Sequence, residues 1–148
     1  MTTPVPALDQ LEIQELVTRY NYAIDRGDVD AWVECFTEDG AFEGIFGRLE
    51  GRAALHAFAT ELTTGPAGER LRPMRHWTTN FVIDPDGEAG GDLGGDSARM
   101  RADHLLVRPT PAGVELLLTA VYRDRLRRSE GGWRFTERVV EVQGGTAL

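Results

Sequence analysis

The sequence contains no lysine, a single cysteine and no long apolar run, and each absence excludes a class of function. All 16 basic residues are arginine, so no lysine amine is available to form a Schiff base with a carbonyl substrate. Cys35 alone can form neither an internal disulfide nor a thiolate metal cluster, and we expect it to be a small buried hydrophobe. No apolar run approaches the roughly 20 residues that cross a bilayer, so we expect no membrane partner.

Positive charge is also in deficit. The chain carries 24 acidic and 16 basic residues, a net charge of −8, which would repel a nucleic-acid backbone. The N-terminus, MTTPVPALDQ, lacks the basic and apolar segments of a signal peptide, and we expect a cytoplasmic protein. No closely spaced histidine pair or convergent carboxylate pair suggests a metal site, and we expect a protein that works without a cofactor.

The chain length and the order of the expected elements indicate one α+β domain over residues 1–148, with a loose arm at 1–8. We expect a helix from an N-cap at Asp9 to a stop at Gly27, then a short helix capped by Asp28. A strand at 41–46 and a helix at 51–62 follow, and residues 63–72 form a loop. Four long strands, at 74–83, 97–107, 114–127 and 133–142, are separated by turn-rich segments, of which 84–96 is the longest.

Helices followed by a meander of strands predict helices packed on one face of a curved antiparallel sheet, as in a conical α+β barrel. Such a cone encloses a cavity suited to a small molecule. Alternation along the first long strand places His76 and Asn80 toward the cavity and Trp77, Phe81 and Ile83 on the outer face, although the reverse parity stays open. An exposed cluster of that size predicts a homodimer or larger homo-oligomer formed through the sheet.

The same alternation assigns inward positions on the later strands. His104 shares a face with Met100 and Leu106, and Tyr122 shares a face with Leu118. Arg138 lies with Val140 and Val142, but it could instead pair with a neighbouring glutamate on the surface. The pair Arg101 and Asp103, with the spacing used by one type of epoxide hydrolase, falls on the opposite face, which disfavours that reaction.

Five motifs in order carry a resemblance to a known family. They are Y-x4-D-x-G-D, W-x3-F-x2-D-G, R-H-x3-N, Y-x10-W and W-R-F-x2-R, and the resemblance covers about Asp9 to Val142. Together they resemble the SnoaL-like family of the nuclear transport factor 2-like superfamily, which has a cystatin-like fold. Dehydratases and related lyases of this family imply catalytic roles for Tyr20, Asp25 and His76. They also imply substrate-binding roles for Arg138 and His104, whereas Tyr122 replaces an asparagine that some of them carry.

These residues suggest a proton-transfer site. A carboxylate of Asp25 bonded to one nitrogen of His76 would leave the other nitrogen as a base, and Tyr20 could donate a hydrogen bond to a developing enolate. Tyr20 and Asp25 lie roughly 140° apart on an ideal helix, so we expect the last helical turn to be irregular. Further substrate contacts are assigned to His104, Tyr122, Arg138, Asn80 and Trp32.

The sequence favours a cofactor-independent dehydratase acting on a small hydrophobic hydroxy-carbonyl or polyketide-like substrate. A polyketide cyclase or a ketosteroid-isomerase-like enzyme would use the same proton transfer and remains an alternative. A non-catalytic binding or assembly module is a third, because fold does not fix function. In that case Asp25 would be a solvated helix end and His76 a hydrogen-bonded sheet residue.

Overall fold

The computed structural model describes residues 3–87 and 95–145, which form three α-helices, a short 3-10 helix and six strands. The helical elements are α1 (Ala7–Arg26), α2 (Val29–Glu34), α3 (Arg52–Thr64) and η1 (Pro66–Gly68). The strands are β1 (Phe36–Gly44), β2 (Gly47–Glu50), β3 (Arg75–Pro85), β4 (Ser97–Thr110), β5 (Gly113–Ser129) and β6 (Gly132–Gly145).

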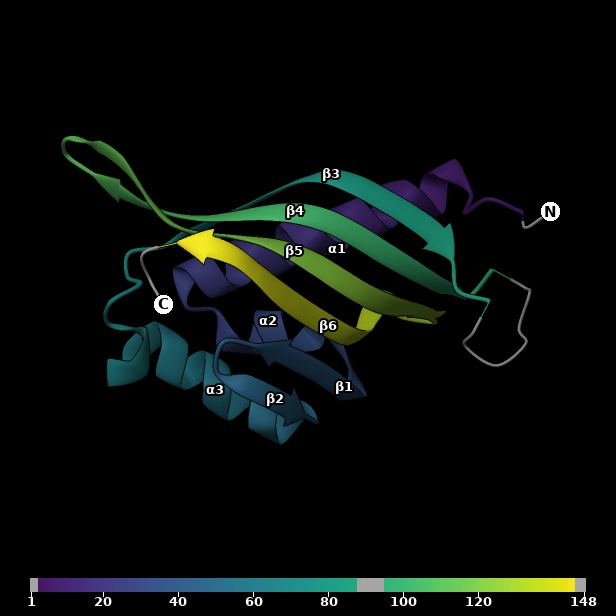
Figure 1. The fold of residues 1–148 in the computed structure, drawn as a ribbon. Coiled ribbons are helices and arrows are strands. Elements are labelled where there is room, and N and C mark those ends of the chain that lie inside the picture. The colour runs from purple at the N-terminus through teal and green to yellow at the C-terminus, as the bar shows by residue number, and fades with distance from the viewer. Residues whose placement is uncertain (1–2, 88–94, 146–148) are drawn as a thin grey trace.

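The strands form one curved sheet in the order β2-β1-β6-β5-β4-β3, and the helices lie against one side of it (Figure 1). This confirms the predicted α+β fold with helices covering a curved sheet. The sheet is mixed, because β1 runs parallel to β6, whereas every other neighbouring pair is antiparallel. The prediction of a wholly antiparallel sheet is therefore wrong at this one pairing. Within 3–87 and 95–145, no helix is both long and apolar enough to cross a membrane.

The first helix begins earlier than predicted. Its N-cap is Pro6, and Asp9 lies inside the first turn, where its buried carboxylate accepts hydrogen bonds from Arg128 Nη1 at 2.6 Å and Trp133 Nε1 at 3.1 Å. Asp9 thus ties the helix to the distant β5–β6 hairpin instead of capping its own helix. Asp28 does cap α2, since its carboxylate accepts from the Ala31 amide at 3.1 Å.

A bulge in β3 reverses the predicted parity beyond Thr79. Asn80 adopts a left-handed φ of 58°, and the pairing with β4 shifts register between Thr79 and Val82. Phe81 and Ile83 consequently pack against the core, and the Asn80 side chain donates to Asp103 Oδ2 at 2.8 Å on an exposed surface. The expectation that Asn80 faces the cavity and that Phe81 and Ile83 face outward is therefore wrong.

Other element boundaries also differ from the prediction. The strand expected at 41–46 is longer and begins at Phe36, and the unpredicted strand β2 pairs with it. The third strand runs on to Pro85, and part of the expected 84–96 loop, residues 88–94, lies outside the described residues. Residues 63–72 contain the last residues of α3 and then η1.

Candidate functional site

The concave side of the sheet encloses a cavity of about 70 Å³. Four polar aromatic side chains contribute to its lining: Tyr20 from α1, His76 from β3, His104 from β4 and Tyr122 from β5. The remaining lining is apolar and comes from the β1–β2 hairpin, α3, the segment before β3 and the ends of the long strands: Phe42, Gly44, Ile45, Phe46, Phe58, Leu62, Leu71, Met74, Leu106, Leu118, Val140 and Val142. Polar groups thus converge at one end of an otherwise apolar pocket.

Asp25 holds His76 through two hydrogen bonds. Its Oδ1 lies 2.6 Å from His76 Nδ1, and its Oδ2 accepts from the His76 backbone amide at 2.9 Å. The two side chains are only 5% and 11% exposed, so little water competes for these bonds. An ionised carboxylate only accepts hydrogen bonds, so in the neutral imidazole that this contact favours Nδ1 carries the proton and Nε2 has the lone pair. His76 therefore offers a fixed basic nitrogen on a residue that lines the cavity.

The predicted irregular last turn of α1 is not needed for this contact. The helix continues regularly to Arg26 and ends at Gly27, which has a φ of 75°. Asp25 and Tyr20 instead reach His76 from different directions, since the Tyr20 ring meets the His76 ring edge-on with centroids 6.4 Å apart. His76 on β3 therefore contacts both Tyr20 and Asp25, although the two lie on different faces of α1.

Two further rings continue from His76 across the sheet. His76 stacks on His104 with centroids 5.0 Å apart, and His104 stacks on Tyr122 at 4.6 Å. Burial, helped by the nearby His76 and Arg138, lowers the pKa of His104 to about 2, so this imidazole stays neutral in the physiological range. Its Nδ1 atom is buried and has no hydrogen-bond partner among the residues that the structure describes. His104 therefore cannot act as a base near neutral pH.

A buried ion pair lies beneath these rings. Arg138 is fully buried, and its Nε and Nη2 atoms donate to the two carboxylate oxygens of Asp124 at 2.9 and 2.8 Å. Its guanidinium carbon lies 3.8 Å from the centroid of the Tyr122 ring and 4.4 Å from that of Tyr20. Burial alone would lower the pKa of Arg138, but the Asp124 carboxylate more than offsets this and the pKa lies above its ordinary value. The surface pairing of Arg138 with a neighbouring glutamate is thus replaced by a buried pair.

Tyr20 keeps its hydroxyl hydrogen in this setting. Burial raises the pKa of Tyr20 to about 12, and the positive charge of Arg138 only partly opposes the shift. A phenol that stays protonated is a hydrogen-bond donor at neutral pH. Its position in the cavity lining makes it available to a carbonyl oxygen.

Two residues assigned to the site lie elsewhere. Trp32 is 1% exposed and packs behind the cavity wall, with its ring centroid 5.4 Å from Tyr20 and 6.0 Å from Phe58. Asn80 lies on the outer face because of the bulge. The structure thus brings Tyr20, Asp25, His76, His104, Tyr122 and Arg138 together, with Trp32 as support.

Sequence reasoning missed Asp124, although a signal was present. It shares strand parity with Tyr122 and Leu118, and its partner across the sheet is Arg138 itself. A carboxylate in an inward-facing, otherwise apolar set needs a buried cation, and Arg138 was already placed on the inner face. No group of three or more side chains suited to a metal occurs in the part of the chain that the structure describes.

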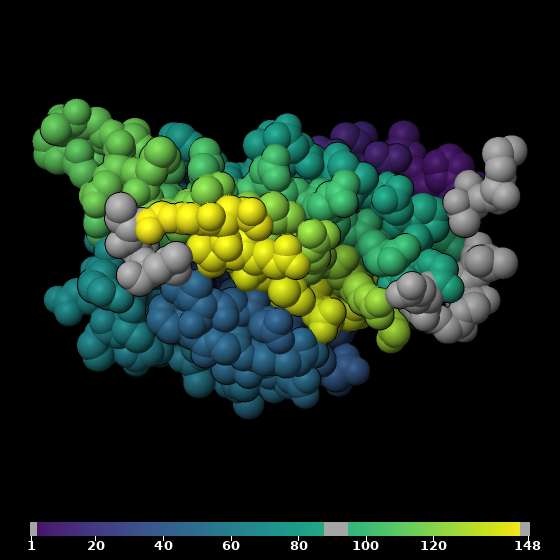
Figure 2. Space-filling view, viewed as in Figure 1, coloured from purple at the N-terminus to yellow at the C-terminus, as the bar shows by residue number. Residues whose placement is uncertain are grey.

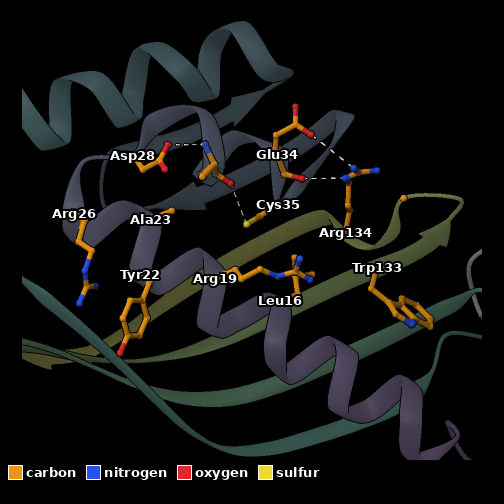
Figure 3. A pocket seen from close by; sticks show the side chains of 12 residues that line it. Leu16, Arg19, Tyr22, Ala23, Arg26, Asp28, Glu34, Cys35, Trp133 and Arg134 are labelled. Atoms are coloured by element: carbon orange, nitrogen blue, oxygen red, sulfur yellow. Dashed lines mark hydrogen bonds and ion pairs between the residues drawn. The ribbon is translucent and has the colours of Figure 1, made fainter.

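A separate hollow of about 480 Å³ lies outside the cone, between α1, α2 and the β5–β6 turn. Figure 3 shows that its acidic groups are already engaged: Asp28 caps α2, and Glu34 faces Arg134, whose Nε also donates to the Glu34 carbonyl at 3.0 Å. Arg26 stacks on the exposed ring of Tyr22 at 4.0 Å. None of the predicted catalytic residues reaches this hollow, which leaves the interior cavity as the candidate site.

A family model described as the SnoaL-like domain matches residues 6–139. Among solved structures, a Mycobacterium tuberculosis protein of unknown function is 34% identical, with a TM-score of 0.75, over 92% of this chain and 72% of its own. A Nostoc punctiforme protein of unknown function with a cystatin-like fold is 26% identical, with a TM-score of 0.74, over 95% and 96% of the two chains.

A third solved structure bears on the fold alone. A Novosphingobium aromaticivorans protein provisionally assigned as a scytalone dehydratase is 19% identical, with a TM-score of 0.76, over 95% of this chain and 88% of its own. No curated protein gives a significant match.

Proposed function

Because the chain belongs to the SnoaL-like family, whose members include dehydratases, isomerases and cyclases, we propose that it is a cofactor-independent dehydratase of small hydrophobic hydroxy-carbonyl compounds. The observation that carries the proposal is the pairing of His76 with Asp25 at 2.6 Å in the wall of an apolar cavity. Alternative cyclase or isomerase activities would use the same base. The dehydratase is preferred because the resemblance to dehydratases of this family covers Tyr20, Asp25 and His76.

In the proposed reaction, His76 Nε2 removes a proton from the carbon between the carbonyl and the carbinol. The electron pair moves into an enolate, whose oxygen accepts a hydrogen bond from the Tyr20 hydroxyl. The carbon–oxygen bond of the carbinol then breaks, and the imidazolium of His76 returns its proton to the departing hydroxide. The products are an unsaturated ketone and water, and His76 is neutral again.

The surrounding charges favour this sequence. The Asp25 carboxylate stabilises the imidazolium that forms on His76, in the way that the orienting acid does in a hydrolase triad. Arg138, paired with Asp124 beneath the Tyr20 ring, partly offsets the rise in the pKa of Tyr20 and so favours its hydroxyl as a donor to the enolate. A neutral His104 adds a hydrogen bond to the substrate without competing for the proton.

The test is elimination of water from diacetone alcohol and from 3-hydroxycyclohexanone, followed by the absorbance of the enone product. We expect His76→Ala to lower kcat at least about 100-fold, and Asp25→Asn to lower it by a similar factor, because the amide no longer fixes the tautomer. His56→Ala is the matched control, since His56 is an exposed histidine on α3 whose ring bonds Asp30 and does not line the cavity. An unchanged rate in His76→Ala would reject the assignment of the base.

A further inference from the structure

A second, larger hollow adjoins the catalytic cavity on the outside of α3. It measures about 480 Å³ and is lined by Phe46, Leu49, Ala54, Ala57, Phe58, Glu61, Leu62 and Ala67. Three of these residues, Phe46, Phe58 and Leu62, also line the interior cavity. The two spaces are therefore separated by the side chains that they share, and movement of those side chains would join them.

The interior cavity alone is too small for most hydrophobic substrates. Its volume is about 70 Å³, whereas a cavity that binds benzene measures about 150 Å³. The space beside His76 therefore holds the reacting carbonyl end of a substrate and little more. Any longer apolar part must lie outside the cone, and the adjoining hollow is the apolar space on the other side of the shared side chains.

The separating wall includes an exposed apolar turn. Ile45 and Phe46 form the tip of the β1–β2 hairpin and are 43% and 47% exposed, and Gly47 closes the turn with a φ of 96°. Turn tips are normally polar, and two exposed apolar residues there contribute little to the fold. Phe46 contacts Phe58 across the gap with ring centroids 5.8 Å apart. Phe46 is thus a half-exposed side chain, which can swing away at a smaller cost in buried area than a phenylalanine of the core.

The floor of the hollow suits an apolar chain. Ala54, Ala57 and Ala67 have small side chains that leave a trough along α3. The charged lining residue, Glu61, is already engaged, because its carboxylate accepts from the Ala67 amide at 3.0 Å. The trough therefore offers mainly apolar contact to a ligand, with the Glu61 carboxylate tied to the Ala67 amide at its edge.

We propose that this trough, here named the α3 groove, holds the apolar chain of a substrate whose carbonyl end reaches His76 past Phe46. The proposal rests on the proposed function and narrows its substrate class to carbonyl compounds that carry an extended apolar tail. Short hydroxy-ketones would then react slowly through weak binding, and tail length would set affinity.

The test uses unreactive methyl ketones of increasing chain length, from methyl ethyl ketone to methyl nonyl ketone, with binding measured by isothermal titration calorimetry. We expect affinity to rise about two- to fourfold per added methylene, as for partial to full burial of a CH₂ group. Ala57→Glu places a charge in the groove and should lower the affinity of methyl nonyl ketone at least about tenfold, with little change for methyl ethyl ketone.

Ala53→Glu is the matched control, because Ala53 is exposed on the same helix but does not line the groove. Absence of binding, affinity independent of length, or equal losses in the two variants would overturn the proposal. Binding is measured without turnover, so the two proposals fail separately. A length gradient that persists in an inactive protein rejects only the reaction, and catalysis by His76 without a gradient rejects only the groove.

Discussion

His104 is a single residue whose protonation is linked to folding. Its pKa falls to about 2 in the folded protein because the ring is buried, and an unfolded histidine has a pKa near 6.5. Below about pH 6.5 the unfolded chain therefore binds a proton at this position that the folded chain does not. The stability that neutral His104 contributes is therefore fully present above the pKa of the unfolded histidine and is lost as the pH falls below it.

We expect this residue to cost the protein about 2 kcal/mol of unfolding free energy between pH 7.5 and pH 5.0, on the basis of about 1.4 kcal/mol per pH unit. His104→Gln should remove that part of the acid loss, so its stability should vary less with pH than that of the wild type. Urea unfolding at the two pH values measures the difference. The control is His56→Gln, because His56 is 53% exposed in its side chain, and it should leave the acid loss unchanged. Equal pH dependence in wild type and His104→Gln would show that His104 accepts a proton when folded.

Much of the candidate site could be predicted at this scale, because strand parity decides which side chains meet. His76, His104, Tyr122 and Arg138 face inward as alternation predicts. The partner of Arg138 could not be chosen by adjacency in sequence, since Asp124 lies on another strand and becomes its neighbour only through the β5–β6 register. The prediction that Asn80 faces the cavity was wrong for a different reason. One residue with a left-handed backbone reverses the facing of every later position in its strand.

The bulge is an element-scale feature with a measurable cost. A left-handed backbone is tolerated by asparagine and glycine, but it costs most other residues about 1–2 kcal/mol. The bulge also turns Phe81 and Ile83 toward the core, where both are partly buried, so β3 cannot relax to regular pairing without exposing them further. We therefore expect β3 to keep its bulge even when residue 80 is replaced by one that disfavours a left-handed backbone.

We expect Asn80→Val to lower the unfolding free energy by about 1–2 kcal/mol and Asn80→Gly to change it by less than about 1 kcal/mol, as measured by urea unfolding. Thr79→Val is the control, because Thr79 is an exposed neighbour whose φ is not positive. If Asn80→Val were as stable as Asn80→Gly, residue 80 would not be left-handed in solution.

Other element boundaries were beyond sequence reasoning for a common reason. The parallel pairing of β1 with β6 joins residues about 95 positions apart, such as Phe42 and Arg138, and no local pattern encodes it. The early start of α1 likewise depends on distant partners, because the Asp9 carboxylate is satisfied by Arg128 and Trp133. Local periodicity located each long helix and strand, and tertiary contacts set where each one ended.

At the scale of the whole molecule, one face of the sheet has no helix over it among residues 3–87 and 95–145. In Figure 2, β4, β5 and β6 lie open on the side opposite the helices. Trp77 is 53% and Val82 44% exposed there. Trp77 pairs across the sheet with Leu105. Val82 pairs with Arg101, and the same row continues through Arg123 to Val139. Of the predicted cluster, Trp77 lies on the outer face and Phe81 and Ile83 do not, whereas the unpredicted Val82 lies there.

We expect this face to join two copies of the chain, because exposed apolar side chains among paired charges are typical of homodimer contacts. Sedimentation equilibrium should then give a mass of about 33 kDa, twice the 16.4 kDa of one chain. Trp77→Arg should shift the mass to that of one chain, because its charge would be buried without a partner. Leu11→Arg, at a 63% exposed position of α1, should leave the dimer intact. A wild-type mass of one chain, or a dimer that survives Trp77→Arg, would exclude this face as the interface.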